Sequence, residues 1–331
     1  MSADLVARLG GIHAATIVPM RPDFSIDEVA LAEHMRRVAS APGIRGLLVN
    51  GHAGENFVLT GAEQNRVVEI ARAVVPADRM IVAGVNRESS LAAARDAAAR
   101  EAAGADALLI FPPNSWALDH AEAAVAIHHA HVRDATSCPL LIYGAPVGAG
   151  ALAYSPGVLT TLAREPRIVA IKDGSWEVAA YEANRRLLKA MRPDFVVLGS
   201  GDEHLLASYL IGSEGSQVSL AAVIPETVCA LWSACEAGDW EAARAVHELI
   251  YPLAASVYRD APGARATARL KACLRILGRI ECDAVRPPQP PATAEEYRAI
   301  ERALRVVASL PNGDFHAGAL LSVDGSLARS Q

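Results

Sequence analysis

Eight short apolar segments, separated by stretches with helical spacing, constrain the fold of this chain more than any other feature. Each is rich in Val, Ile, Leu or Ala, and they lie at residues 12–18, 44–49, 80–85, 106–111, 139–143, 168–172, 195–199 and 216–220. Strands that alternate with helices in this way form βαβ units around a parallel sheet. Eight consecutive units match a closed barrel, and no GxGxxG turn follows the first segment, as a dinucleotide-binding sheet would require. We therefore predict an α/β fold, a (β/α)8 TIM barrel.

Helical patterns replace the strand pattern after residue 224. They lie at 226–237, 239–256, 264–278 and 294–309, and the Pro-rich connector RPPQPPAT precedes the last of them. The end of the chain is polar and contains Gly and Ser. The expected organisation is a catalytic barrel at 1–224, a C-terminal helical extension at 225–310 and a flexible tail at 311–331.

Composition excludes several classes of partner. The net charge of -6 and the absence of a basic stripe argue against nucleic acid, whose phosphates require clustered Lys and Arg. No apolar run reaches the roughly 20 residues that span a bilayer, and the N-terminus lacks a signal-peptide pattern. The five cysteines form no CxxC pair, which indicates reduced thiols and no zinc site. We expect a cytoplasmic protein that binds a small molecule, without nucleic-acid or membrane partners.

The 31 basic residues include only three lysines, Lys172, Lys189 and Lys271. Lys189 and Lys271 lie in helical patterns, where a lysine is normally solvated. Lys172 instead ends the apolar segment 168–172, and the active site of a TIM barrel lies at the carboxyl ends of its strands. Burial there lowers the pKa of an amine, which can then attack a carbonyl. The alternative is a structural lysine that pairs with Asp173.

Polar residues also end three other predicted strands. Tyr143 follows the fifth and could transfer a proton, although a lone tyrosine is more often a core residue with a wet hydroxyl. Gly51 and Gly54 bracket a tight turn after the second, in which converging backbone amides could hold a carboxylate; such turns are also purely structural. Asp202 and Glu203 follow the seventh, where they could bind hydroxyl groups or simply favour a helix start.

Two histidine features leave alternatives open. His52, in the turn after the second strand, could act as an acid, a base or a donor, or could face solvent. The cluster of His128, His129 and His131 lies in a helical pattern without a second ligand type at the right spacing, so we predict a surface face and no metal site.

The combination of GHAGE after the second strand, Tyr143 after the fifth and IKD at Lys172 resembles the dihydrodipicolinate synthase and N-acetylneuraminate lyase superfamily. The resemblance covers about residues 10–310 and includes the ATIVPM, SGDE and GSEGSQVS segments. It implies that Lys172 forms a Schiff base with a 2-oxo acid and that Tyr143 relays protons, with no cofactor and no metal. It also implies a homotetramer or homodimer that packs partly through the C-terminal helices. The expected substrate-binding residues are Gly51, His52, Ala53, Gly54, Asn114, Asp202, Glu203 and Gln217.

Departures from the superfamily pattern argue against a typical dihydrodipicolinate synthase. Such synthases usually carry hydroxyl residues in place of His52 and Ala53, and a tyrosine near the position of Asn114. They also carry an arginine shortly after the catalytic tyrosine, where this chain reads GAPVGAG. Without it, a second substrate with a carboxylate lacks a bidentate partner.

The leading hypothesis is a Schiff-base lyase, an aldolase or dehydratase, acting on a 2-oxo acid such as a 2-oxo-3-deoxy sugar acid. The alternative from another class is a catalytically idle barrel that binds a 2-oxo acid as a sensor or scaffold, because the usual hydroxyl relay is missing. Dihydrodipicolinate synthesis ranks third.

Overall fold

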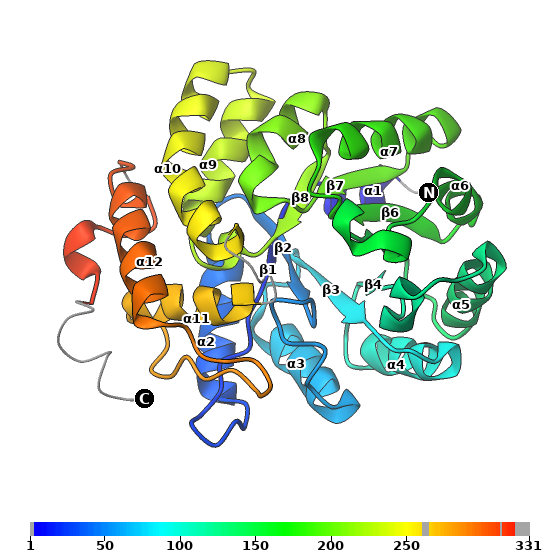
Figure 1. Cartoon of the computed structure of the whole chain (residues 1–331), viewed down its shortest axis with the longest axis horizontal. Coiled ribbons are helices and arrows are strands. Elements are labelled where there is room, and N and C mark those ends of the chain that lie inside the picture. The colour runs from blue at the N-terminus through cyan, green and yellow to red at the C-terminus, as the bar shows by residue number, and fades with distance from the viewer. Residues whose placement is uncertain (1–2, 260–264, 312, 322–331) are drawn as a thin grey trace.

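The eight strands form a closed parallel barrel in a computed structural model that describes residues 3–259, 265–311 and 313–321 (Figure 1). Neighbours pair in chain order, and β1 also pairs with β8. The strands are β1 (Gly11–Ala15), β2 (Ile44–Val49), β3 (Met80–Val85), β4 (Ala107–Ile110), β5 (Leu140–Gly144), β6 (Ile168–Asp173), β7 (Val196–Gly199) and β8 (Gly215–Val218). Every predicted apolar segment overlaps one of them, so the TIM-barrel prediction is confirmed.

A helix follows each strand and covers the outside of the barrel. These helices are α2 (Glu28–Ser40), α3 (Gly61–Val74), α4 (Ser90–Ala102), α5 (Glu122–Asp134), α6 (Pro156–Ala163), α7 (Val178–Met191), α8 (Leu205–Ile211) and α9 (Pro225–Glu236). The last of them, α9, packs against α8 and β1 and thereby takes the place of the eighth barrel helix. The expected domain boundary at residue 224 falls just before it.

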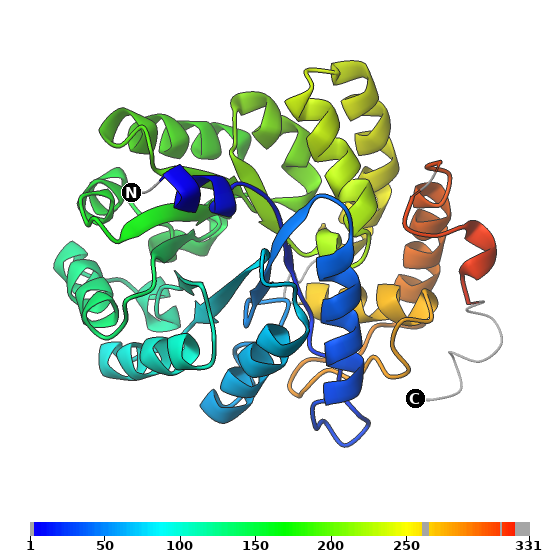
Figure 2. The ribbon, with the colours of Figure 1, turned by 180° about the vertical axis from the view of Figure 1, so that it is seen from behind.

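Alternation along the strands separates an inner cluster from the layer between strands and helices. Leu141 and Tyr143 of β5 belong to the inner cluster, whereas Leu140 and Ile142 belong to the outer layer. At the amino end of the barrel, Leu9 of α1 (Ala3–Leu9) is buried in the inner cluster, so this helix closes that end (Figure 2). The opposite end, where the strands finish, remains for the functional site.

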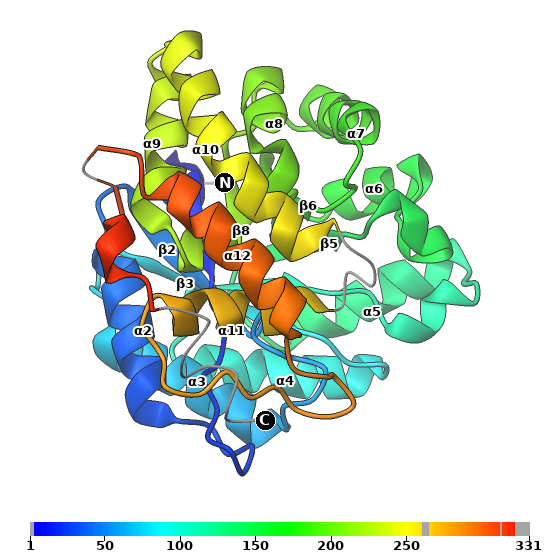
Figure 3. The same cartoon turned by 60° about the vertical axis from the view of Figure 1, so that its left-hand side comes forward.

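The predicted C-terminal helices are present as α10 (Trp240–Tyr258), α11 (Ala266–Ile276) and α12 (Ala294–Val307). Figure 3 shows α12 running alongside α10, and α11 packs against both. Beyond α12, the Asp314 carboxylate accepts the backbone N–H groups of Glu226 and Thr227 at the start of α9, at 3.1 and 3.0 Å. Residues 322–331 of the predicted tail lie outside the described residues. None of the described helices is long and apolar enough to cross a membrane.

Two expectations about helical side chains are wrong. Lys271 is not solvated: it is completely buried in α11 and pairs with Glu55. His128 and His129 do not form a surface face with the exposed His131, because both are buried on the inner side of α5. The spacing of residues along a helix shows which side chains share a face, but it does not show what packs over that face.

Candidate active site at the carboxyl end of the barrel

Lys172 lies inside the mouth of the barrel, with 8% of its surface exposed. Its neighbour Asp173 faces the helix layer, where it accepts the side-chain N–H of Asn184 and the backbone N–H of Ser175, both at 2.9 Å. The alternative of a Lys172–Asp173 ion pair therefore fails. Burial lowers the pKa of Lys172 to about 8, and the nearby Asp202 opposes this shift. Near neutral pH a substantial fraction of Lys172 is thus the free amine.

Tyr143 is the direct register partner of Lys172 across the β5–β6 pair. The Lys172 Nζ atom lies 5.9 Å from the centre of the Tyr143 ring. Burial raises the pKa of the Tyr143 phenol, so its hydroxyl carries its proton at neutral pH. Gly174 accommodates this hydroxyl, because a Cβ atom at residue 174 would lie 3.0 Å from it and 2.8 Å from the Gly144 carbonyl oxygen. The two candidate catalytic groups therefore share one side of the mouth.

A cavity of about 1040 Å³ opens above this pair. Six of the residues predicted from the sequence line it: His52, Ala53, Tyr143, Lys172, Asp202 and Gln217. A pocket of this size holds a ligand larger than pyruvate, since typical small-molecule sites occupy roughly 300–1,000 Å³.

The turn after β2 leaves three of its backbone amides available to a ligand. The N–H of Gly54 donates to the Gly51 carbonyl at 3.1 Å, and the N–H of Glu55 donates to the His52 carbonyl at 3.0 Å. In the described part of the chain, the amides of His52 and Ala53 have no such acceptor. The Gly51 amide has no such acceptor among the described residues either. Of the predicted anion nest, only the Gly54 amide is thus used within the turn.

Aromatic rings surround the His52 imidazole. Its ring centre lies 4.8 Å from that of Phe57, 4.6 Å from that of Phe111 and 5.2 Å from that of Tyr143. The enclosing protein and then the charge of Lys172 lower the pKa of His52. His52 is therefore a neutral imidazole at neutral pH, suited to hydrogen bonding and to holding the Tyr143 ring in place.

Asp202 and Gln217 give the cavity its polar floor. One oxygen of the buried Asp202 carboxylate accepts the Leu220 N–H at 2.8 Å. Burial raises the pKa of this carboxyl to about 6. Gln217 is fully buried, and neither atom of its amide is hydrogen-bonded to any described residue. A buried amide in this state normally binds a ligand or water.

Four predicted site residues do not line the cavity. Gly51 and Gly54 belong to the turn described above, and the other two are Glu203 and Asn114. The Glu203 carboxylate is instead taken by Arg259, with Nη2 2.6 Å from Oε2. Asn114 lies on η1 (Asn114–Ala117), where its backbone N–H donates to Glu88 at 2.8 Å. The sequence places both residues after barrel strands, but it does not show which way their side chains turn.

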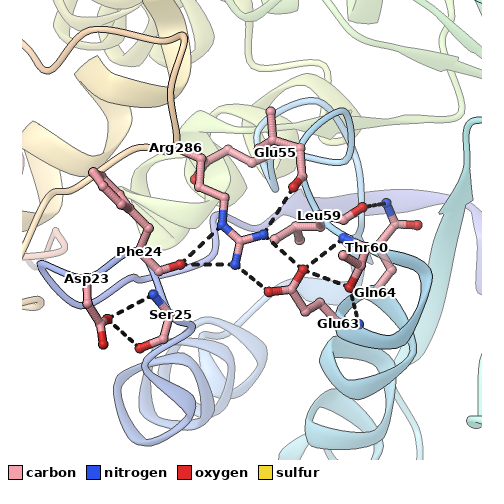
Figure 4. A network of polar contacts seen from close by, with 10 residues as sticks. Asp23, Phe24, Ser25, Glu55, Leu59, Thr60, Glu63, Gln64 and Arg286 are labelled. Carbon is pink, nitrogen blue, oxygen red and sulfur yellow. Dashed lines mark hydrogen bonds and ion pairs between the residues drawn. The ribbon is translucent and has the colours of Figure 1, made fainter.

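The C-terminal extension roofs the cavity through α11 and the segment 286–290. Arg286 fixes this segment to the barrel: its guanidinium pairs with Glu63 and donates to the Phe24 carbonyl, as Figure 4 shows. It also donates to the Val58 carbonyl. Its backbone N–H also donates to Glu55 at 3.0 Å. The roof is thus attached to the same β2–α3 turn that carries His52.

Sequence reasoning missed several cavity residues that do not themselves end a barrel strand. They are Phe57, Trp176, Tyr258, Thr267 and Arg286. One signal was available: Trp176 closely follows Lys172, and its positive φ of 59° marks an unusual backbone conformation. Among the described residues, no group of three or more His, Cys, Asp or Glu side chains could hold a metal ion.

Comparisons with known proteins agree with this geometry. The model of the dihydrodipicolinate synthetase family matches residues 8–307. The 4-hydroxy-tetrahydrodipicolinate synthase of Methanopyrus kandleri is 28% identical over 311 residues, covering 92% of this chain and 99% of that protein. The synthase of the same name from Kineococcus radiotolerans is 31% identical over 311 residues, covering 91% of this chain and 94% of that protein.

Solved structures give the same result. A dihydrodipicolinate synthase from Agrobacterium tumefaciens superposes with a TM-score of 0.81 at 28% identity, covering 92% of this chain and 100% of that chain. An E. coli prophage protein of the family, solved in complex with pyruvate, superposes with a TM-score of 0.82 at 22% identity, covering 90% of this chain and 98% of that chain. Because the family model spans most of its length, this chain belongs to the dihydrodipicolinate synthetase family and is a lyase.

Proposed function

We propose that Lys172 forms a Schiff base with the C2 carbonyl of a 2-oxo acid, which the enzyme then cleaves or dehydrates at C4. The observation that carries the proposal is the pairing of a buried amine, whose pKa is about 8, with the Tyr143 phenol in one closed mouth. Family membership supports the general reaction, that of a Schiff-base lyase with a pyruvate-type substrate. The roles given to individual residues belong to the proposal.

The chemistry follows from the imine. Attack of Lys172 on C2 releases water, for which Tyr143 supplies and removes protons. The protonated imine then accepts electrons from C3, either when the C3–C4 bond breaks or when a C3 proton leaves before the C4 hydroxyl. The amides of His52 and Ala53 hold the substrate carboxylate, since converging N–H groups favour an anion.

The cavity supports a substrate that extends well beyond pyruvate. Asp202, Gln217, Ser219 and Thr267 line it as polar groups that can bind hydroxyls. We therefore propose a 2-oxo acid that carries hydroxyl groups, such as a 2-oxo-3-deoxy sugar acid, as the substrate class.

Lysine-biosynthetic condensation is the second candidate, because the two curated relatives described above are named 4-hydroxy-tetrahydrodipicolinate synthases. Its second substrate brings a carboxylate, for which a free guanidinium is the usual partner. Of the arginines, only Arg265 and Arg286 line the described part of the cavity, and both already pair with glutamates. The helical turn after Tyr143, η2 (Val147–Leu152), contains no basic residue. These contacts favour cleavage or dehydration.

We also propose a homotetramer or homodimer, which sedimentation of the purified protein would test.

For the activity, we suggest a screen of 2-oxo acids with product masses as the readout. Wild type should convert a 2-oxo acid that carries a C4 hydroxyl. The Lys172→Ala variant should not convert it, and the control variant Lys189→Ala should convert it at the wild-type rate. If wild type binds 2-oxo acids but converts none, the barrel is catalytically idle. If it converts only pyruvate with aspartate semialdehyde, it is a synthase.

A further inference from the structure

Tyr258, at the last position of α10, brings a second phenol into the cavity from the C-terminal extension. Its hydroxyl oxygen is buried. It lies beside the Asp202 carboxyl and the Ser219 hydroxyl, close enough for Asp202 to raise the pKa of the phenol together with burial. Tyr258 thus places its hydroxyl within hydrogen-bonding reach of Asp202 and Ser219, among the polar groups that line the cavity.

Two contacts hold the end of α10 over the barrel. The next residue, Arg259, pairs with Glu203 through its Nε and Nη2 atoms, at 3.2 and 2.6 Å. The Tyr258 ring itself packs on Trp176, with ring centres 5.3 Å apart. Because Glu203 directly follows Asp202, the ion pair sets Tyr258 beside Asp202. This gives Glu203 a positioning role in place of the substrate contact expected from the sequence.

Tyr258 and Tyr143 approach the cavity from different elements. Tyr143 stands next to Lys172 on the neighbouring strand, where it can serve the C2 carbonyl and the imine. Tyr258 and Asp202 come from α10 and from η3 (Asp202–His204), which lie in contact beside the mouth. The two phenols can therefore act on different atoms of one substrate.

We propose that Tyr258 is a catalytic residue that takes the proton of the substrate's C4 hydroxyl and relays it to Asp202. This inference rests on the proposed Schiff base at Lys172. In cleavage, the C4 hydroxyl proton passes to the Tyr258 oxygen, while the Tyr258 proton passes to the Asp202 carboxylate. The C4–O electrons form the aldehyde, the C3–C4 bond breaks, and its electron pair forms an enamine as the iminium nitrogen is neutralised. The step leaves Asp202 protonated and the pyruvate unit bound to Lys172.

The test compares Tyr258→Phe with wild type in three assays. The first is borohydride trapping of pyruvate, and the second is exchange of the pyruvate methyl protons in deuterated water. Both require Lys172 but no C4 hydroxyl. The third is cleavage of 2-oxo-3-deoxygluconate and of further 2-oxo acids with a C4 hydroxyl. Tyr154→Phe, which removes a buried hydroxyl outside the cavity lining that has no hydrogen-bond partner among the described residues, is the matched control.

Tyr258→Phe should trap and exchange pyruvate within about 3-fold of wild type but lose about 10²–10⁴-fold in cleavage, the usual contribution of a general base. Tyr154→Phe should match wild type in all three assays. Cleavage by Tyr258→Phe at the wild-type rate would overturn the proposal, and so would an equal loss in all three assays, which would indicate a structural role. The proposed role of Tyr258 is also wrong if wild type traps pyruvate but cleaves no 2-oxo acid with a C4 hydroxyl. Absence of trapping on Lys172 in wild type would instead refute the Schiff base itself.

Discussion

Lys271 of α11 is completely buried and forms an ion pair with Glu55, in the turn that carries His52. The Lys271 amine also donates to the Ala284 carbonyl at 2.6 Å. Through this pair, the C-terminal extension is attached to the barrel directly beside the cavity. The helix that roofs the site and the turn proposed to bind the substrate carboxylate are thus held as one unit.

Breaking this pair should destabilise the protein strongly. Lys271→Met leaves the Glu55 carboxylate buried without its cation, which typically costs about 3–5 kcal/mol in the free energy of unfolding. Lys189 pairs with Glu214 at the surface, with 22% of its side chain exposed, so Lys189→Met should cost less than about 1 kcal/mol. Urea denaturation of the two variants measures the difference. Equal losses of unfolding free energy in the two variants would contradict the stabilising role of the buried Lys271–Glu55 pair.

Arg286 should stabilise the roof in a pH-dependent way. Its hydrogen bonds lower the pKa of Glu63 to about 2 from the ordinary 4.5. A carboxylate with a lowered pKa contributes stability above its ordinary pKa and loses it as the pH falls toward the lowered value. The difference in unfolding free energy between wild type and Arg286→Met should therefore be full at neutral pH and shrink between pH 4.5 and 2. A difference that stays constant over this range would exclude the Glu63 contact as its source.

Imine formation should follow the titration of Lys172. Only the free amine attacks a carbonyl, and burial lowers the pKa of Lys172 to about 8. The rate of pyruvate trapping at limiting pyruvate should therefore rise with pH through about 8 and then level off. A rate that continues to rise toward the ordinary lysine pKa of 10.5 would show that the amine is not desolvated.

Turnover at saturating substrate should follow Asp202, because Lys172 is then held as the imine. The relay requires a carboxylate, and burial raises the pKa of Asp202 to about 6. The value of kcat should thus fall as the pH drops below about 6. In Asp202→Asn, kcat should be low and independent of pH in this range. If kcat of Asp202→Asn still fell at low pH as it does in wild type, a group other than Asp202 would be responsible for the pH dependence.

The barrel, and the position of the proposed catalytic pair at its mouth, could be predicted from the sequence because both depend on local patterns. Apolar segments of strand length place Lys172 and Tyr143 at strand ends, and in a parallel barrel all strands end on the same side. The expected structural partner of Lys172, Asp173, could be judged only in three dimensions, where strand alternation turns it toward α7.

The remainder of the site depends on tertiary packing that the sequence does not encode locally. Tyr258 lies at a helix end, and the Glu203–Arg259 pair and the contact with Trp176 hold it near Asp202. Lys271 resembles a surface lysine in its helical pattern, yet α11 lies between the barrel and α12. Asn114 follows a strand end, as the site residues do, but its backbone amide is held by Glu88 away from the cavity lining.

Covalent trapping tests the central role of Lys172 most directly. Wild type is incubated with pyruvate and borohydride, and the digested protein is then mapped by mass spectrometry, which is simplified because the chain has only three lysines. One carboxyethyl group should appear on the peptide that contains Lys172, with Lys189 and Lys271 unmodified. Lys172→Ala should remain unmodified under the same conditions. An unmodified Lys172 in folded wild type, or equal modification of Lys189, would contradict the account.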